Sequence, residues 1–399
     1  MIRPLRFAAI ALSLTALAPS TGGDTRVPRE WVASQHRIEA GPGLPAVDVD
    51  IFLAPDRERQ RERYRVAAAV AITHFSQWFG VGPHARLTIA DAPWNAAATA
   101  RADEPLVLAS GQWLNFDRAS EPEASILTGI AEKWFATTEQ VLRKGLALYL
   151  AHRALAEEYE NRAFVGRFFG GHIPMIFRSV ATAEASSREG PPGDPPAETA
   201  RWMLTAERLL GWPLVQAVLA SYSADHRARP GSIRDLQDAF ERVSGRNLSW
   251  FFDQMQSRAT LDFAVERVTS VSIKTDEGTR MRTSVTLARK GDGTFPGRSR
   301  PAHSIATARG AIPVRVDFAS GESVDETWNG RDAHYELTFL SSSPPVAVRV
   351  DPDRVLASER RRVDNSWTVR PRAADVALVW SARWLVWLEH CILGFAALA

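Results

Sequence analysis

The spacing of apolar residues changes near Thr260, and the change divides the chain into two kinds of structure. From about Glu62 to Gln256 apolar residues recur every three or four positions, which is typical of amphipathic helices. After Thr260 apolar and polar residues alternate in short runs, which indicates strands with one buried face. One earlier alternating run, 47–52, predicts a strand near the N-terminus. The pattern therefore predicts an α+β protein, in which a mainly helical domain is followed by a small β-sandwich.

Two consecutive helices are predicted in the middle of the helical part. Residues 120–123 form a capping box with proline in the first turn, which predicts a helix start. The apolar positions of this helix are Ile126, Leu127, Ile130, Ala131, Trp134 and Phe135. The next helix is predicted to begin near 137–140 and to bury Val141, Leu142, Leu146 and Tyr149.

Later helices are predicted over 200–210, 214–222 and 232–243, with a stop at Gly245. The proline-rich stretch 190–196 predicts a loop, since proline lacks the amide hydrogen that helices and central strands need. The strands of the sandwich are predicted at 265–273, 282–287, 314–318, 334–339 and 346–350.

The N-terminus is typical of an export signal. Arg3 and Arg6 precede an apolar run, 7–17, that ends in a small-residue cleavage pattern, so removal after Ala18 is predicted. An uncleaved anchor or a wrongly chosen start are the alternatives. The domains expected from the sequence are a signal peptide at 1–18, a short β segment at 19–61, the helical domain at 62–260 and the sandwich at 261–365.

The C-terminal segment 373–399 is predicted to form an amphipathic helix. Its apolar side would carry Trp380, Trp384, Trp387 and Phe395, while Arg383 and His390 lie on another side. Tryptophan at headgroup level and the arginine cluster upstream, 360–372, favour a helix that lies in an anionic membrane surface. Docking on the protein's own surface and a membrane-spanning helix are the alternatives. The sequence therefore indicates an exported, membrane-associated protein of the periplasm or cell envelope.

Composition excludes several other kinds of site. The formal net charge of the 399 residues is +2, which argues against a nucleic-acid partner. One cysteine, Cys391, excludes a disulfide framework and a cysteine-ligated zinc site. The sequence also lacks the H-E-x-x-H, G-x-S-x-G and P-loop motifs.

Three stretches in the right order resemble the gluzincin zinc aminopeptidases, the family of the membrane alanyl aminopeptidases. Residues 243–254 are similar to the end of that family's catalytic domain, 130–136 to the segment behind its zinc motif, and 145–149 to the segment after its third zinc ligand. The resemblance covers about 45–365 and implies a thermolysin-like helical domain followed by a β-sandwich.

The resemblance also implies where the family's zinc site would lie. The first zinc-binding histidine corresponds to Thr128, the general-base glutamate to Gly129 and the second histidine to Glu132. Lys144 stands in place of the third ligand, and Arg143 in place of the asparagine before it. Zinc hydrolysis needs three ligands and a base for the attacking water. The sequence therefore implies a degenerate member without a metal cofactor.

We hypothesise that the Lys144 ammonium takes roughly the place of the zinc and pairs with Glu132, with a hydrogen bond from Thr128. The motivation is that an acid and a base have exchanged places at two ligand positions. The alternative is that Glu132, Lys133, Arg143 and Lys144 are solvated surface charges.

Three functions remain open from the sequence. The first is a non-catalytic binding or scaffolding protein with a peptide or protein ligand. The second is an active zinc aminopeptidase whose ligands come from His152 with Glu157 or Glu158, or from His172. The third is a structural subunit that docks on a membrane complex through its C-terminal tail.

Overall fold

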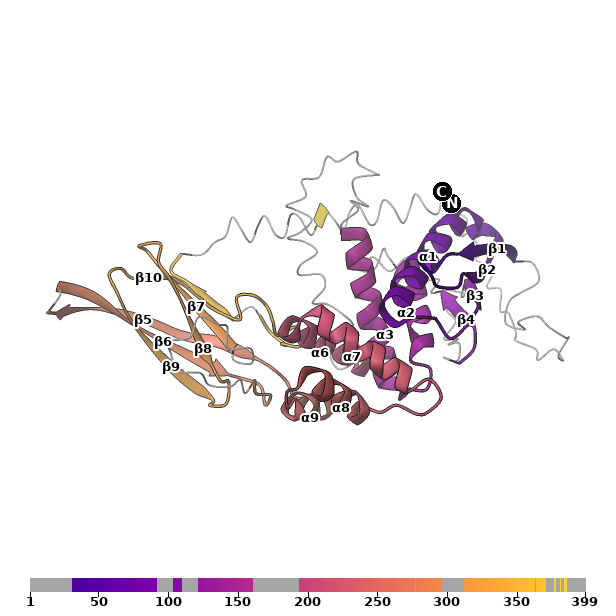
Figure 1. The fold of residues 1–399 in the computed structure, drawn as a ribbon. Helices are drawn as coiled ribbons and strands as arrows, with labels where there is room; N and C mark the ends of the chain where they lie inside the picture. Colours follow the sequence, from indigo (N-terminus) through magenta and orange to yellow (C-terminus); the bar gives the residue numbers. More distant parts are fainter. Residues whose placement is uncertain are drawn as a thin grey trace, which may run out of the picture.

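The computed structural model describes residues 31–91, 103–109, 121–160, 194–276, 278–295, 312–362, 364–370 and positions 377, 381, 384 and 385. Over these residues it has seven α-helices and three small sheets (Figure 1). The α+β class is therefore confirmed. The predicted signal peptide, the capping residue Ser120 and most of the C-terminal segment lie outside the described residues.

The first sheet has the strand order β1-β2-β3-β4. Its strands are β1 (Val32–Ile38), β2 (Val47–Leu53), β3 (Arg86–Asp91) and β4 (Leu106–Ala109). β1 is antiparallel to β2, and β2, β3 and β4 are parallel. A short 3-10 helix, η1 (Pro55–Gln60), and helix α1 (Arg61–Phe79) connect β2 to β3.

Strands β3 and β4 were missed from the sequence, although β2 was predicted correctly. Leu87, Ile89 and Val107 are buried, and so are Ala90 and Leu106 on the other face of the sheet, where Thr88 and Leu108 are half-buried. Strands buried on both faces form short continuous apolar runs instead of alternating patterns. In a helical stretch such runs cannot be told from a piece of buried helix.

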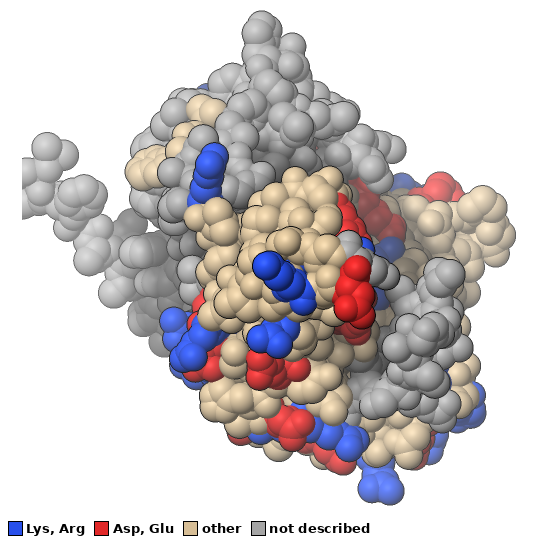
Figure 2. Space-filling view, turned by 90° about the vertical axis from the view of Figure 1, so that its left-hand side faces the viewer, with Lys and Arg blue, Asp and Glu red and all other residues tan. Residues whose placement is uncertain are grey.

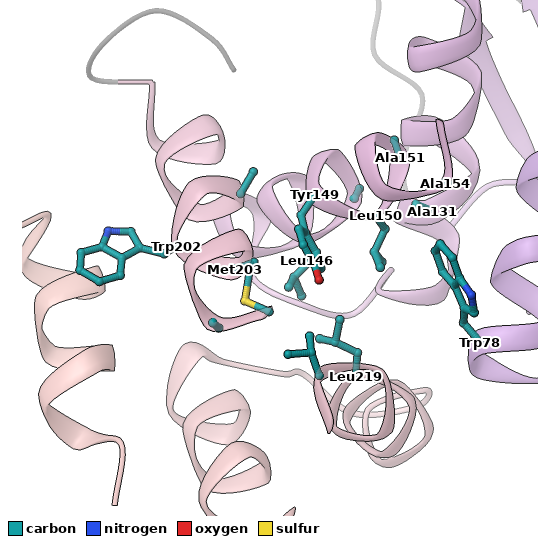
Figure 3. Packing of buried hydrophobic residues seen from close by; sticks show 14 of the residues in the cluster. Trp78, Ala131, Leu146, Tyr149, Leu150, Ala151, Ala154, Trp202, Met203 and Leu219 are labelled. Carbon is teal, nitrogen blue, oxygen red and sulfur yellow. The ribbon is translucent and has the colours of Figure 1, made fainter. Parts of the chain in front are cut away.

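Among the remaining helices, α3 packs between α2 and α6, α7 packs against α1, α6 and α8, and α9 packs against α8. Their bounds are α2 (Glu121–Trp134), α3 (Gln140–Leu155), α6 (Pro195–Leu210), α7 (Trp212–Asp225), α8 (Ile233–Ser244) and α9 (Ser249–Ser257), and a π-helical turn, η2 (Ala156–Glu160), follows α3. Figure 3 shows Leu146, Tyr149 and Leu150 of α3 around the same space as Met203 and Leu219 of the neighbouring helices. All five are buried, so α3 is the central element of the helical core.

Local sequence signals fix several helix ends. The Ser232 side chain accepts from the Asp235 amide at 3.2 Å and the Asp235 carboxylate accepts from the Ser232 amide at 2.9 Å, which is a capping box at the start of α8. Gly245 ends this helix in the left-handed region, at φ 64°. The stop predicted there is confirmed.

Two local predictions were wrong. Pro195 and Pro196 were assigned to a loop but occupy the first turn of α6, where the missing amide hydrogen has no helical partner to lose. Asp194 caps this turn by accepting from the Ala197 amide at 3.2 Å. Val141 was expected to be buried but is 45% exposed, because it lies in the first turn of α3 on the side away from the core.

Two sheets in the C-terminal part pack face to face through aromatic contacts, in the region where a small β-sandwich was predicted. One contains β5 (Phe263–Thr275), β6 (Gly278–Arg289) and β9 (His334–Ser341); the other contains β7 (Ile312–Phe318), β8 (Ser323–Trp328), β10 (Pro345–Val350) and β11 (Ser366–Thr368). The ring centroids of Phe263 and Trp328 lie 5.3 Å apart across the interior, and those of Phe318 and Phe339 lie 6.3 Å apart. β8 and β11 were missed because their alternation is short and polar.

A loop after β10 joins the sandwich to the helical part. The Ser358 amide donates to the Thr205 hydroxyl on α6 at 3.2 Å, and the Arg208 side chain donates to the Arg354 carbonyl at 2.5 Å. On the sandwich side, the Glu359 carboxyl accepts from the Phe263 amide at 3.1 Å and from the Asn365 side chain at 2.7 Å. Residues 351–365 therefore connect α6 to the start of β5.

The Glu359 carboxyl generates a prediction about pH. Burial raises its pKa to about 8, against contributions from its hydrogen bonds that lower it. The folded protein therefore holds this proton up to about pH 8, whereas the unfolded chain releases it near pH 4.5. We expect the free energy of unfolding to fall as pH rises from about 5 to 8, and Glu359→Gln to reduce this slope, as measured by urea unfolding at several pH values.

Glu322→Gln is the matched control, because Glu322 is exposed on the same sandwich. It should leave the slope unchanged. Equal slopes for the Glu359→Gln variant and the unmodified protein would show that Glu359 ionises normally in the folded state.

Candidate functional site

The five positions implied by the family resemblance lie on two packed helices. Thr128, Gly129 and Glu132 are on α2, and Arg143 and Lys144 are in the first turn and a half of α3. α2 and α3 form a helical hairpin whose members pack along their length. The sequence analysis therefore identified two elements that the structure does bring together.

The first two positions serve packing within α2 and against the sheet. The Thr128 hydroxyl donates to the Ala124 carbonyl of its own helix at 2.7 Å. A Cβ placed on Gly129 would lie 2.6 Å from Cγ1 of Val107 on β4, which is closer than real Cβ contacts. The position of the family's general base thus faces a strand that leaves no room for a side chain.

A buried lysine that the sequence analysis did not single out as functional lies one turn further along the same face of α2. Lys133 is 4% exposed, and its ammonium donates to the Leu106 carbonyl of β4 at 2.8 Å. Burial lowers its pKa to about 8, although nearby acids, Glu132 first among them, oppose the shift. Positions 129 and 133 share one helix face, so this face of α2 packs against β4.

Glu132 pairs with Arg143 at 3.4 Å, and both side chains are less than one-fifth exposed. Arg143 also donates to the carbonyls of Ala136 at 3.4 Å and Thr138 at 3.1 Å, just beyond the end of α2. These contacts give hydrogen-bond donors to two carbonyls of the connection between α2 and α3. The Glu132–Arg143 pair therefore stabilises the connection between α2 and α3.

The hypothesis of a Glu132–Lys144 pair with a Thr128 hydrogen bond was wrong. Within the described chain Lys144 forms no salt bridge, and the basic partner of Glu132 is the residue before it. Arginine suits this place better, because its planar fork can serve a carboxylate and two carbonyls together, whereas a lysine presents a compact point charge.

The second face of the hairpin is also filled. A Cβ on Gly145 would lie 2.3 Å from Cβ of Thr199 and 2.9 Å from the Pro196 carbonyl oxygen, both on α6. α3 and α6 therefore cross at a separation that requires glycine. Close approaches at Gly129 and Gly145 show that the elements around the degenerate positions are packed against one another.

The alternative ligands proposed from the sequence are not brought together in the described part of the chain. The Glu157 carboxylate accepts from Arg153 at 2.6 Å and lies 3.7 Å from Nε2 of His74. Among the described residues no group of three or more His, Cys, Asp or Glu side chains could hold a metal ion. His172 lies outside the described residues.

A partly buried ionic network that includes Glu157 was also missed from the sequence. The Tyr149 hydroxyl donates to the Glu207 carboxylate at 2.5 Å, and Arg153 donates to the same carboxylate. The guanidinium carbon of Arg153 lies 3.7 Å from the ring centroid of Trp212. Burial raises the pKa of the Tyr149 hydroxyl well above its usual value. Both carboxylates of the network accept hydrogen bonds from Arg153, so they do not form a metal site. We interpret the network as a structural contact between α3, α6 and α7.

The residues at the degenerate positions do not fit a zinc ion. Thr128 bonds to its own helix, Gly129 has no side chain, and Glu132 is paired with a guanidinium. Arg143 and Lys144 add positive charge where a cation would have to bind. Zinc sites are built from neutral histidine, thiolate and carboxylate ligands, which this donor set does not supply.

Comparison with known proteins supports the fold. No protein-family model matches the chain, and no curated protein matches it. Among solved structures, aminopeptidase A of Legionella pneumophila in complex with aspartic acid matches with a TM-score of 0.52 at 12% identity. The match covers 87% of this chain but 39% of that one, so the chain spans about two-fifths of its length. The chain therefore has a peptidase-like fold.

Of the four predicted membrane-contact residues, Trp384 is the one within the described part of the chain. Trp384 is in a helical conformation and is 61% exposed, and its neighbour Leu385 is 44% exposed. Trp380, Trp387 and Phe395 lie outside the described residues. No helix within the described ranges is long and apolar enough to cross a membrane.

The close contact at Gly129 predicts that a Gly→Ala substitution there changes stability in the opposite direction to the same substitution in an open helix. In an open helix Gly→Ala stabilises by up to about 1 kcal/mol. We expect Gly129→Ala instead to destabilise the protein by about 1–3 kcal/mol, because the new methyl overlaps Val107. Chemical unfolding measures the difference. Combining it with Val107→Ala should cost less than the sum of the two single changes. A stabilised Gly129→Ala variant, or strict additivity, would contradict the close approach.

Proposed function

We propose that this protein is a non-catalytic relative of the gluzincin aminopeptidases, exported and membrane-associated, which acts by binding or scaffolding. The observation that carries the proposal is the packing of α2 against β4. The face that would present a base to a substrate instead contacts Val107 through Gly129 and the Leu106 carbonyl through Lys133. A peptidase cannot use a face that is buried in its own core.

Residues 243–254, the stretch that most resembles the family, have structural roles that can account for the resemblance. Phe251 and Phe252 of α9 are buried, and the ring centroid of Phe251 lies 5.0 Å from that of Trp202. The Gln254 side chain accepts from the Thr294 amide at 2.5 Å, after β6. Phe251 packs within the helical part and Gln254 contacts the segment after β6, so folding accounts for these residues without catalysis.

A peptide or protein remains the proposed ligand, and the membrane surface the proposed location. Support for the location comes from the exposed helical Trp384 and from the arginines that precede the tail in the sequence. A non-catalytic protein that keeps a peptidase-like frame would act by holding a partner near the membrane.

Metal analysis of the purified full chain, with an aminoacyl-anilide assay, tests the loss of catalysis. We expect substoichiometric zinc and no chelator-sensitive turnover, because the degenerate positions lack a suitable donor set. The Legionella aminopeptidase, purified and assayed in parallel, controls for metal loss during preparation. Stoichiometric zinc with turnover that a chelator abolishes would overturn the proposal and would point to ligands outside the described residues, such as His172.

Cell fractionation tests the location. We expect the full chain in the membrane fraction, and the variant with Trp380→Ser, Trp384→Ser and Trp387→Ser in the soluble fraction, because the substitutions remove the large interfacial side chains from one helix face. A chain that ends at Arg372 should behave like this variant. Retention of both at the membrane would show that the tail does not mediate membrane contact.

A further inference from the structure

Two chain segments lie side by side where the helical part meets the sandwich. Residues 258–262 lead from α9 into β5, and residues 351–365 follow β10 and reach α6 (Figure 1). Leu261 and Glu359 form a parallel β-bridge, and the Arg360 amide donates to the Leu261 carbonyl at 2.8 Å. We call residues 261–263 together with 351–365 the joint.

Three carboxyl groups are buried in the joint. The exposed fractions of Asp262, Asp351 and Glu359 are 7%, 4% and 7%. Oδ1 of Asp262 is inaccessible to solvent and has no hydrogen-bond partner in the described part of the chain. Acidic residues are almost never fully buried unless they are paired, because taking a charge out of water is costly. Three of them in the contact between two parts of one chain therefore require an explanation.

Acids on the surface of the sandwich have basic partners. Figure 2 looks onto the sandwich from the end away from the helices and shows acidic and basic side chains on its surface. One such pair on the sandwich is Arg315 with Asp325, whose side-chain atoms lie 2.7 Å apart. The hydrogen bond from Arg315 lowers the pKa of the Asp325 carboxyl. The buried acids of the joint show the opposite shift.

The surroundings of Glu359 favour its neutral form. Burial is the largest effect and raises the pKa of the carboxyl to about 8. Hydrogen bonds from the Phe263 amide at 3.1 Å and from the Asn365 side chain at 2.7 Å lower the pKa. Of its charged neighbours, Asp351 raises the pKa and Arg362 lowers it. Glu359 therefore stays neutral in the closed joint at pH values where a solvated glutamate is ionised.

Burial also raises the pKa of the Asp262 and Asp351 carboxyls. The charged groups that face these two acids come from α6, from the residue after β6 and from the segment that follows β10: Arg208, Lys290, Arg360, Arg361, Arg362 and Asp364. Asp364 adds to the shift at Asp262, and the bases oppose the shifts. All three buried acids of the joint therefore hold their protons more firmly than they would in water.

A second contact between the helical part and the sandwich has no titratable side chain. The Gln254 side chain of α9 accepts from the Thr294 amide at 2.5 Å, and the ring centroids of Trp250 and Phe295 lie 5.0 Å apart. The charge of this contact does not change with pH. If the joint opened, the two parts would therefore stay attached through α9 and the link 258–262.

We propose that the joint is a pH-sensitive hinge, which is closed while Glu359 holds its proton and opens when Glu359 releases it. An ionised carboxylate at this place is hydrated only if residues 351–365 move away from 261–263 and admit water. Because the proton is held more firmly in the closed state, closure is favoured in acid and is lost as pH rises. The inference concerns how the two parts are held together, and it does not depend on the proposed ligand or location.

Trypsin digestion of the purified full chain tests the hinge, because Arg360, Arg361 and Arg362 lie in the joint. Proteolysis of a folded protein follows the population of its opened state. The rate of cleavage there, divided at each pH by the rate for a synthetic peptide of residues 351–365, should rise roughly fiftyfold from pH 6 to pH 8. The reason is that Glu359 releases its proton near pH 4.5 when solvated and near pH 8 in the closed joint.

Glu359→Gln should remove this pH dependence, because glutamine keeps an oxygen for the Phe263 amide but does not titrate. Asp353→Asn is the matched control, since Asp353 is exposed in the same segment. It should show the same rise as the unmodified protein. Circular dichroism at each pH verifies that the variants are folded, and cleavage at Arg201 of α6 and Arg282 of β6 reports opening elsewhere.

A rise confined to the joint and absent from the Glu359→Gln variant would support the hinge. An equal rise at Arg201 and Arg282 would indicate global unfolding and overturn it, as would a constant normalised rate in the unmodified protein or an equal rise in the Glu359→Gln variant. If that variant does not fold, the comparison of sites in the unmodified protein still decides. None of these results bears on the zinc analysis or the cell fractionation, so the hinge and the proposed function are tested separately.

Discussion

The helical part of this protein depends on one partly buried cation, the guanidinium of Arg153. It donates to Glu207 of α6 and Glu157 of η2, and it lies against the ring of Trp212 at the start of α7. Arg153 and Glu207 are each less than one-fifth exposed, so loss of either would leave the other's charge without its partner in a partly buried place. Because α3, α6 and α7 all contribute, the network fixes their relative position.

The position of α3 then decides what the degenerate site can be. Tyr149 and Arg153 share the face of α3 that meets Glu207, so α3 cannot rotate or slide without breaking both contacts. With α3 fixed on α6, the close approach at Gly145 follows, and α2 is in turn held between α3 and β4. Active-site clefts need space between elements, and this arrangement removes it.

Some features of this arrangement could be predicted from the sequence, and others could not. Helix ends with their own chemistry, such as the capping box at Ser232, could be located because the signal is local. Strands β3 and β4 could not, because their identity depends on being covered on both sides. The predicted partner of Glu132 was wrong for a related reason. Successive helix residues point about 100° apart, and the sequence alone did not give the rotation of α3 that presents Arg143 instead of Lys144 to Glu132.

Packing can also explain why a sequence resembles the family in its buried stretches but differs at the positions of the family's zinc site. Trp134 and Phe135, Leu146 and Tyr149, and Phe251 and Phe252 lie in the stretches that resemble the family, and all six are buried. Core residues are constrained by their neighbours on every side, because well-packed interiors tolerate few changes of volume. Packing also accounts for the residue at Gly129, since a Cβ there would lie 2.6 Å from Cγ1 of Val107. The stretches that persist then identify a frame, and the function has to be sought on surfaces where burial does not explain the residues.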